Sequence, residues 1–304
     1  MASNQPIKQH DLPATYLRRF VIDSSDKELQ SILWCLRKDR NFNIEKKSIN
    51  SSYFTTENFY TIDGEDPFAI EYFFRDNIEP RYEEVMREVK NERNLSIKCR
   101  QNLMIWLHYS KIRNKNQRDK LKENIYVSQM LNLVPKIGLK KSNELSSKPP
   151  TAIELLAKEL QIKSFAEKNL LNIFDKGLGA KHWSILKAKQ GQYFISNENP
   201  GFSIEINSSA VDFYSLSESF STSVNASNFF ILSPQYCVQI RPHLQGSPIT
   251  INLGNQTIEF EECYQALYDL INFCTFQIAK KYLISNNLSI LENVKIFFDN
   301  EKKR

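Results

Sequence analysis

Apolar residues follow two different spacings along this chain, and the two spacings occupy separate blocks. Apolar positions three and four residues apart, which are typical of helices, dominate residues 96–130, 151–174 and 261–285. Short apolar runs bounded by Gly, Asn and Pro, which are typical of strands, cluster at 31–46 and at 182–260. Because strands and helices do not alternate strictly, the pattern predicts an α+β fold, with long helices packed around clusters of short, mainly antiparallel strands.

The first third of the chain predicts a hairpin followed by helices. Residues 31–46 contain two strand-like runs around a turn at 39–41, which predicts a β-hairpin. A helix is expected from Pro67, and Pro80 should break or kink it because proline lacks the backbone N–H and clashes with the preceding turn. The second helix, 80–91, is heavily charged and is expected to face solvent.

The middle of the chain predicts two further helices joined by a connector. Ser96 can cap the longest helix, which is expected to reach about residue 130. Residues 136–150 have little periodicity and contain Gly, Ser and Pro, as an exposed and mobile connector does. A capping box of Thr151 and Glu154 opens the next helix, which should end near Phe174.

The last third predicts short strands and one long helix. Strands are expected at 182–188, 193–196, 229–232 and 237–240, with a long Ser- and Asn-rich loop over 203–228. A hairpin around Gly254-Asn255 should join 249–253 to 257–260, and a helix should follow over 261–285. We expect a single α+β domain over 1–304, with a mostly helical half 1–135, a linker 136–150 and a mixed half 151–304.

Composition excludes several classes of protein. Hydrophobic residues make up 41% and charged residues 25% of the 304 residues, which excludes a disordered chain, a collagen-like fibre and a membrane bundle. The five cysteines form no C-x-x-C pair, so we expect buried thiols rather than disulfides or a zinc ribbon. The chain has neither a secretory leader nor a long apolar segment, so a cytoplasmic location without membrane contact is expected.

Common catalytic and nucleotide-binding motifs do not occur in the sequence. It contains no G-x-x-x-x-G-K-S/T loop, no G-x-G-x-x-G, no G-x-S-x-G elbow and no H-E-x-x-H. The net charge of +5 permits contact with nucleic acid without implying it. A site therefore has to be sought among scattered polar residues.

Several short elements resemble, in order, those of the bacterial domain of unknown function family 4238. The opening His10-Asp-Leu-Pro-Ala-Thr-Tyr16-Leu-Arg-Arg-Phe20 resembles its H-x-x-P-x-x-Y/F-L-x-x-F element. Other similar elements are Asn58-Phe59-Tyr60, Ser110-x-x-Arg113, Phe194-Ile-Ser-Asn197-Glu198-Asn199-Pro200, Leu232-Ser233-Pro234, and Asn272, Ala279 and Tyr282 near the end. Ser110 stands where the family has Gln, and Glu198 where it has Asp. The resemblance covers roughly residues 10–285 and implies an architecture and candidate positions, but no activity.

His10 is the first candidate catalytic residue. Its imidazole could act as a general base or hold phosphate near neutral pH. Tyr16, in the same element, is a candidate binding residue. Alternatively, His10 and Pro13 fasten the start of the chain while Tyr16 and Phe20 dock in the core.

Glu198 is the second candidate, together with the amides that flank it. A carboxylate between Asn197 and Asn199 after a strand could hold a divalent metal or orient a water molecule. The alternative is an ordinary β-turn, since Asn and Pro favour turns.

Arg113 is the third candidate, within the most basic stretch of the chain, 111–122. It could clamp a phosphate or pair with Glu198. Lys115 and Arg118 are candidate nucleic-acid contacts. The alternative is that all three belong to a solvated basic face.

A group of acidic residues around Pro80 is a further possible source of metal ligands, or consists of surface acids. Its members are Glu71, Asp76, Glu79 and Glu83.

Two functional hypotheses follow. The first is an enzyme acting on a phosphate-bearing substrate, a nuclease or nucleotide-processing effector with a nucleic acid or nucleotide as its partner. In it Glu198 would bind a divalent metal or position water, Arg113 would neutralise phosphate and His10 would move a proton, so all three should share one polar cleft. The second is a non-catalytic interaction protein with a protein partner, in bacterial defence or a toxin–antitoxin system.

Overall fold

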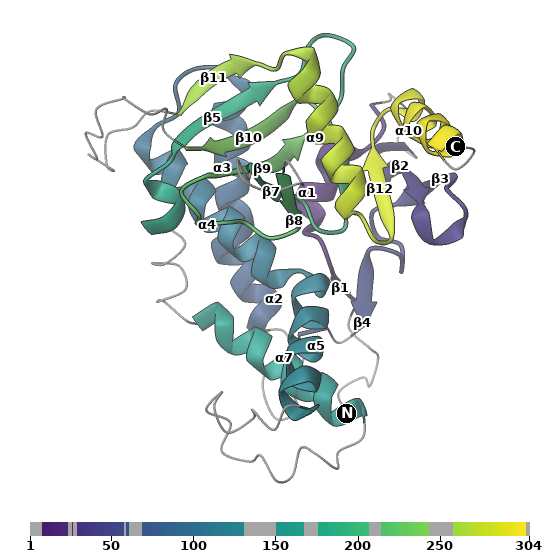
Figure 1. The fold of residues 1–304 in the computed structure, drawn as a ribbon, viewed down its shortest axis with the longest axis vertical. Helices are drawn as coiled ribbons and strands as arrows, with labels where there is room; N and C mark the ends of the chain where they lie inside the picture. The colour runs from purple at the N-terminus through teal and green to yellow at the C-terminus, as the bar shows by residue number, and fades with distance from the viewer. Residues whose placement is uncertain are drawn as a thin grey trace.

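A six-stranded sheet backed by two long helices forms the largest part of the molecule (Figure 1). The computed structural model describes residues 8–23, 26, 29–57, 59–60, 69–130, 150–166, 176–206, 214–242 and 258–301. Helices and antiparallel strands lie in separate layers, so the expected α+β class is confirmed. No helix among these residues is long and apolar enough to span a bilayer.

The six-stranded sheet is built almost wholly from the second half of the chain. Its order is β11-β5-β10-β9-β7-β8, and the pairs are antiparallel except that β11 runs parallel to β5. Its strands are β5 (His182–Lys187), β7 (Phe202–Ile206), β8 (Tyr214–Ser217), β9 (Ala226–Ser233), β10 (Tyr236–Arg241) and β11 (Glu259–Glu262).

A four-stranded sheet joins the two ends of the chain. Its order is β3-β2-β12-β6, with bounds β2 (Ile32–Arg37), β3 (Asn43–Ser48), β6 (Ser196–Asn197) and β12 (Tyr282–Ser285). The hairpin of β2 and β3 was expected and is confirmed, and its turn contains Asn41 in the left-handed region at φ 50°. A separate pair consists of β1 (Lys8–His10) and β4 (Thr55–Glu57).

The helices pack against these sheets and against each other. They are α1 (Ala14–Leu17), α2 (Ala69–Phe73), α3 (Glu79–Lys90), α4 (Ile97–Arg113), α5 (Lys115–Met130), α7 (Pro150–Ala166), α9 (Gln265–Ile278) and α10 (Leu288–Glu301). Helices α3 and α4 lie behind the larger sheet, and α5 and α7 extend below it in Figure 1. The Tyr82 ring on α3 stacks on Trp106 of α4, with ring centroids 4.3 Å apart.

The helix around Pro80 differs from the expectation in two ways. A π-helical turn, Phe74–Ile78, joins α2 to α3, so the chain passes Pro80 without a break. The wider turn removes the conflict with the proline, because Pro80 occupies the first turn of α3, where its missing N–H is not needed. The expectation that 80–91 faces solvent is wrong, since Tyr82, Val85, Met86 and Val89 are buried.

The helix expected over 96–130 is two helices that meet at Asn114. Ser96 caps the first as expected, accepting the Cys99 amide at 3.1 Å. Asn114 then adopts an extended backbone, φ −65° and ψ 143°, and its Oδ1 accepts the Asn116 amide at 2.8 Å. That side-chain bond begins α5 in a new direction, as an N-cap does.

The bounds expected for the helix over 261–285 are wrong at both ends. Residues 259–262 form β11, α9 ends at Ile278, and Tyr282–Ser285 form β12. Apolar spacing alone does not separate a helix from a fully buried strand, and here pairing with β2 and β6 decides for the strand. Helix α10 follows, where no element was expected.

Other expectations have mixed outcomes. The loop expected over 203–228 contains most of β7, all of β8 and the start of β9, because cross-strand pairing makes strands of segments with weak local signals. The hairpin expected at 249–260 lies mostly outside the described residues, as do the connector 136–150 and the residues beyond 166 of the helix expected to end near Phe174. All five cysteines are buried and free, as expected.

Candidate functional site

Arg113 ends α4 inside the protein, with only 2% of its surface exposed. Its guanidinium pairs with Glu79 at 3.2 Å and with Glu71 at 3.6 Å, and its Cζ lies 4.4 Å from the centre of the Phe74 ring. A buried charge is tolerated when it is paired in this way. Arg113 is therefore not part of a solvated face, and its described partners are Glu71 and Glu79 rather than Glu198. Two of the four acids expected at the surface, Glu71 and Glu79, are thus half-buried and pair with a buried arginine.

His10 lies beside Arg113. It ends β1, and its carbonyl accepts a hydrogen bond from Arg113 Nη2 at 3.3 Å. Burial, and next the Arg113 charge, lower the pKa of the imidazole, so the ring favours its neutral form. Its Nε2 is buried and has no hydrogen-bond partner among the described residues. The structure thus brings together two of the three residues predicted to be catalytic.

The Glu198 carboxylate points to a different part of the chain. Its oxygens accept backbone amides of Lys280, of Lys281 at 2.9 Å and of Tyr282 at 3.3 Å. Burial raises the pKa of this carboxyl, while the amide donors oppose that shift. The contact fastens the turn after β6 to the connection between α9 and β12. No described contact joins the carboxylate to His10 or Arg113, and the catalytic and metal-binding roles of the three stay predictions.

Asn197 and Asn199 hold the same turn from the other side. Asn197 Oδ1 accepts the Asn199 amide at 2.8 Å, and its Nδ2 donates to the Thr275 carbonyl at 2.8 Å. Asn199 Oδ1 accepts from Lys111 Nζ at 2.9 Å. The contact from the Asn199 amide to the Asn197 side chain is of the Asx type, and the other contacts hold this buried bend in place.

The Lys111 ammonium is surrounded by oxygen atoms of the protein. Its Nζ lies between 2.6 and 3.4 Å from the carbonyls of Asn199, Gly201 and Glu218 and from the Asn199 side chain. Burial lowers the pKa of the ammonium. A cavity of about 170 Å³ adjoins it, and there Lys120 pairs with Glu218 at 3.0 Å. The cations at this cavity are therefore already matched.

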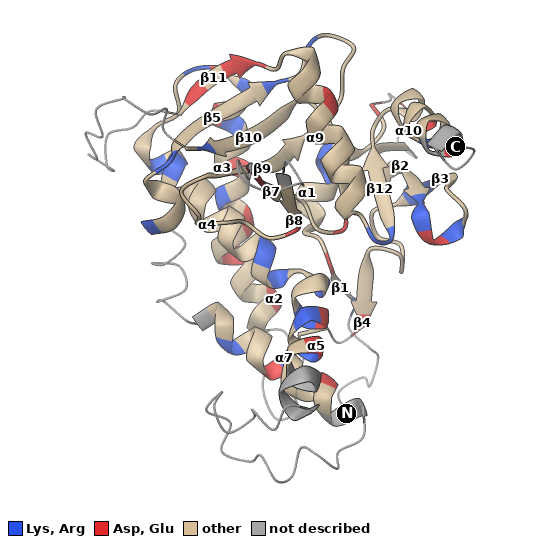
Figure 2. Ribbon diagram, in the orientation of Figure 1, with Lys and Arg blue, Asp and Glu red and all other residues tan. Residues whose placement is uncertain are grey.

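Most of the other cations of the basic stretch are also engaged within the protein. Arg118 is 5% exposed, donates to the Phe59 carbonyl at 2.6 Å and lies 3.6 Å from the centre of the Phe59 ring. Lys122 pairs with Glu154 at 2.7 Å, and Lys115 is half-buried. Blue and red segments lie next to each other on α5 in Figure 2, so the charges there are mixed. The stretch 111–122 is therefore not a wholly solvated basic face, because most of its cations are held by carboxylates, carbonyls and rings.

Tyr16, a candidate binding residue, is part of the core. Its ring is 1% exposed, and its hydroxyl lies 2.6 Å from Ser196 Oγ and donates to the Ile231 carbonyl at 2.9 Å. The side chain links α1 to both larger sheets. This is the docking role that was the alternative for the opening element.

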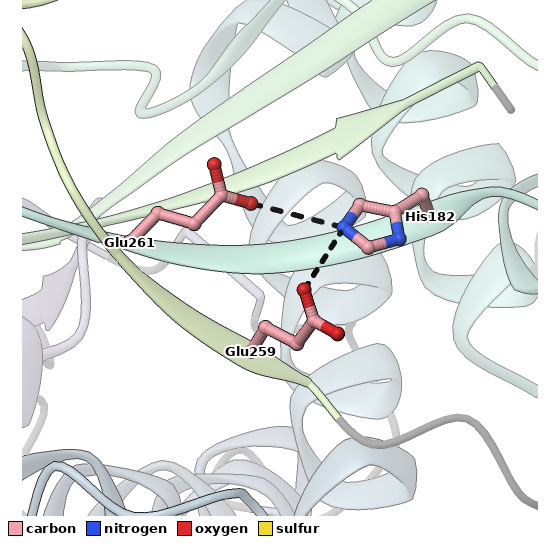
Figure 3. A group of neighbouring side chains, drawn as sticks. All are labelled: His182, Glu259 and Glu261. Atoms are coloured by element: carbon pink, nitrogen blue, oxygen red, sulfur yellow. Dashed lines mark ion pairs between the residues drawn. The ribbon is translucent and has the colours of Figure 1, made fainter. Parts of the chain in front are cut away.

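One cluster that sequence reasoning missed lies on the edge of the large sheet (Figure 3). His182 Nε2 on β5 lies 3.9 Å from Glu259 and 3.8 Å from Glu261, both on β11. Arg241 pairs with the same oxygen of Glu261 at 3.0 Å. Alternate residues of a strand share a face, so the two glutamates meet the histidine by strand geometry. With Arg241 already on Glu261, the arrangement is that of a surface ion-pair group.

A cleft of about 460 Å³ lies where residues 18–23 cross α3 and the turn between β9 and β10; we call it the Arg18 cleft. Among the described residues, three cations line it, Arg18, Arg19 and Lys90, with one carboxylate, Asp23. Arg18 and Lys90 are exposed, whereas Arg19 forms an ion pair with Glu83. Its apolar and amide walls come from Val21, Ile22, Gln30, Met86, Pro234, Tyr236 and Asn286, among others.

The sequence analysis did not predict the Arg18 cleft, although it named two of the elements that contribute residues to it. Arg18 and Arg19 occupy variable positions of the His10–Phe20 element, and Ser233 and Pro234 belong to the Leu-Ser-Pro element. The signal was that these two elements, more than 200 residues apart, resemble the same family. Only the fold brings them to one cleft.

Comparison with known protein families gives a match over most of the chain. Residues 8–289 match the family described as "Protein of unknown function (DUF4238)". No curated protein and no solved structure matches the chain. The matched range includes every residue that lines the Arg18 cleft.

Proposed function

The chain belongs to the DUF4238 family, and from this premise we propose that it binds a phosphate-bearing molecule in the Arg18 cleft. One observation carries the proposal: two exposed cations, Arg18 and Lys90, line a cleft that also contains residues of two elements of the family pattern, while the third cation, Arg19, is paired with Glu83. Such a cleft attracts a ligand with two or more negative charges, and guanidinium groups match the geometry of phosphate oxygens.

The state of the cations supports this cleft over other places in the molecule. Arg113 and Arg118 are buried, Lys111 is half-buried, and all three contact protein oxygens, so a ligand would have to displace those contacts. Arg18 and Lys90 are exposed and can turn toward a ligand. The proposal keeps the phosphate-bearing partner predicted from the sequence and moves it away from His10, Arg113 and Glu198.

Titration calorimetry on the full chain tests the proposal, with inorganic pyrophosphate and ribose 5-phosphate as probes. We expect binding that weakens with added salt, because phosphate contacts are screened. Arg18→Glu and Lys90→Glu should each weaken binding about tenfold or more, equivalent to about 1.4 kcal/mol.

Lys163→Glu is the matched control, since Lys163 is exposed on α7 and does not line the cleft. It should bind both probes as the unaltered protein does. If all three variants lose affinity for the probes equally, the loss reflects only the net charge of the protein and not the cleft. Absence of binding at low salt would contradict the proposal. That second outcome would favour the non-catalytic interaction hypothesis.

A further inference from the structure

Helices α9 and α10 leave an apolar groove between them, which we call the α9–α10 groove (Figure 1). Its volume is about 750 Å³, and at its wall the Phe273 ring of α9 meets the Phe297 ring of α10 edge-on, with centroids 6.3 Å apart. Leu270 is 38% exposed there and Phe297 is 50% exposed. Large apolar side chains that are exposed together mark a surface for association.

The lining of the α9–α10 groove resembles the centre of a protein interface. Among the described residues that line it, Asp269 is the only charged one, and the others are apolar, aromatic or amide side chains. Depletion of charge and enrichment of aromatic rings distinguish the core of protein interfaces from the remaining surface. The groove therefore fits an apolar segment of protein rather than a phosphate.

Two apolar side chains project beside the groove from the same helix. Ile296 is 58% exposed and precedes Phe297, so α10 presents both residues outward. A surface that has a projecting apolar ridge next to an apolar groove can pair with a copy of itself, because the ridge of each copy can pack into the groove of the other.

The charges along α10 favour the same partner. Glu292, Lys295 and Asp299 follow each other at helical spacing and line the cleft between α10 and the β2–β3 hairpin. Lys302 continues the spacing in the sequence, outside the described residues. Because the signs alternate, two copies of this stripe that run antiparallel around Phe297 set Glu292 against Lys302. The same pairing sets Lys295 against Asp299.

We infer that the face formed by α9 and α10 binds a second copy of this chain, in a two-fold dimer whose two α10 helices run antiparallel around Phe297. Glu292, Lys295 and Asp299 form no ion pair with another described residue, so they are available to the second copy. A parallel arrangement would set like charges against each other. The residues of this face do not line the Arg18 cleft, so the inference is independent of the proposed function.

The size of the face sets the expected strength of the dimer. Helices α9 and α10 have 14 residues each, so each is about 21 Å long. Two such helices side by side bury about 800–1,000 Å² over both copies, near the lower end of specific interfaces. We therefore expect a dissociation constant in the micromolar range.

Sedimentation velocity on the full chain from about 1 to 200 μM tests the inference, since this range brackets a micromolar dissociation constant. The mass should rise from that of a monomer to that of a dimer. Phe297→Glu and Leu270→Glu should each weaken the dimer about tenfold or more, because each buries a carboxylate in an apolar contact. Val224→Glu is the matched control, since Val224 is 78% exposed and does not line the groove.

Charge variants test the antiparallel arrangement. Lys295→Glu should weaken the dimer about threefold or more, because it sets two carboxylates against each other at both symmetric contacts. Adding Asp299→Lys should restore the dimer, because the exchanged signs match again when the helices run antiparallel. A loss that the second substitution does not restore would overturn this arrangement.

A monomer at every concentration would overturn the inference. A dimer that both Phe297→Glu and Leu270→Glu leave intact would overturn it too, because another surface would then hold the copies together. If Phe297→Glu does not fold, Leu270→Glu on the neighbouring helix and the charge variants decide the question, with circular dichroism showing that each is folded.

Discussion

Single charged residues in this protein serve mainly to hold segments together. Arg113 lies between Glu71 and Glu79 under the Phe74 ring, and it also binds the His10 carbonyl at the start of the chain. Removing one partner of a buried ion pair leaves the others desolvated and uncompensated, which costs more than the pair itself contributes. Charged residues in a family-like element can thus have a structural role.

At this scale we predict that Arg113→Met lowers the free energy of unfolding by about 3–5 kcal/mol, because Glu71 and Glu79 lose their buried counter-charge. Urea unfolding measures the change. Adding Glu71→Gln and Glu79→Gln to that variant should restore part of the loss. Lys163→Met, on an exposed position, should change stability by less than about 0.5 kcal/mol. An Arg113→Met protein as stable as the original would mean that the carboxylates do not depend on Arg113.

At the scale of elements, the turn between β6 and β7 depends on a glycine. Gly201 has φ +84°, and a Cβ there would lie 2.7 Å from the Phe229 carbonyl and 2.8 Å from the Phe230 ring. Its own carbonyl accepts from Lys111 Nζ at 2.6 Å. The backbone of this turn therefore approaches β9 more closely than any side chain allows.

Gly201→Ala should destabilise the protein more than Gly191→Ala, and the pair isolates the effect of close approach. Gly191 has φ +81°, but a Cβ added there would meet no other atom within 4 Å. We expect about 1–2 kcal/mol for the left-handed backbone at Gly191, and about 1–3 kcal/mol more at Gly201 for the overlap with β9. Thermal or urea unfolding gives both values. If the two variants lose equal stability, β9 moves away from the added Cβ at Gly201 without a cost in free energy.

At the scale of the whole molecule, contacts between the two halves of the chain argue for one unit. Strand β12 fills the gap between β2 and β6, so the smaller sheet needs both ends of the chain. Gln161 of α7 donates to the carbonyls of Ile112 at 2.8 Å and Asn114 at 3.1 Å, where α4 ends, and accepts from Arg118 at 2.8 Å. Neither half can satisfy these groups alone.

We therefore predict that cleavage within 136–150, at an inserted protease site, leaves the halves associated. The cut protein should elute from a sizing column as one species, and calorimetry should show one unfolding transition, because shared strands couple the halves. The uncut protein carrying the same insertion is the control. Halves that separate as stable monomers would contradict the single unit.

The sequence by itself determined the elements whose signals are local. The hairpin over 31–46 follows from alternation and a turn, and the start of α4 follows from one capping serine. The order of the family-like elements identified the family, and the apolar contexts of the cysteines predicted their burial. Each depends on neighbours within a few residues, so a fold is not needed to recognise them.

The tertiary structure alone decided what depends on distant partners. Tyr282–Ser285 could continue a helix, but β2 and β6 make them a strand. Residues 111–122 look like a basic surface, yet carboxylates, carbonyls and rings from elsewhere engage most of their cations. The Arg18 cleft joins residues more than 200 positions apart. Local preferences differ by less than about 1 kcal/mol per residue, and burial and charge pairing exceed them once the chain is folded.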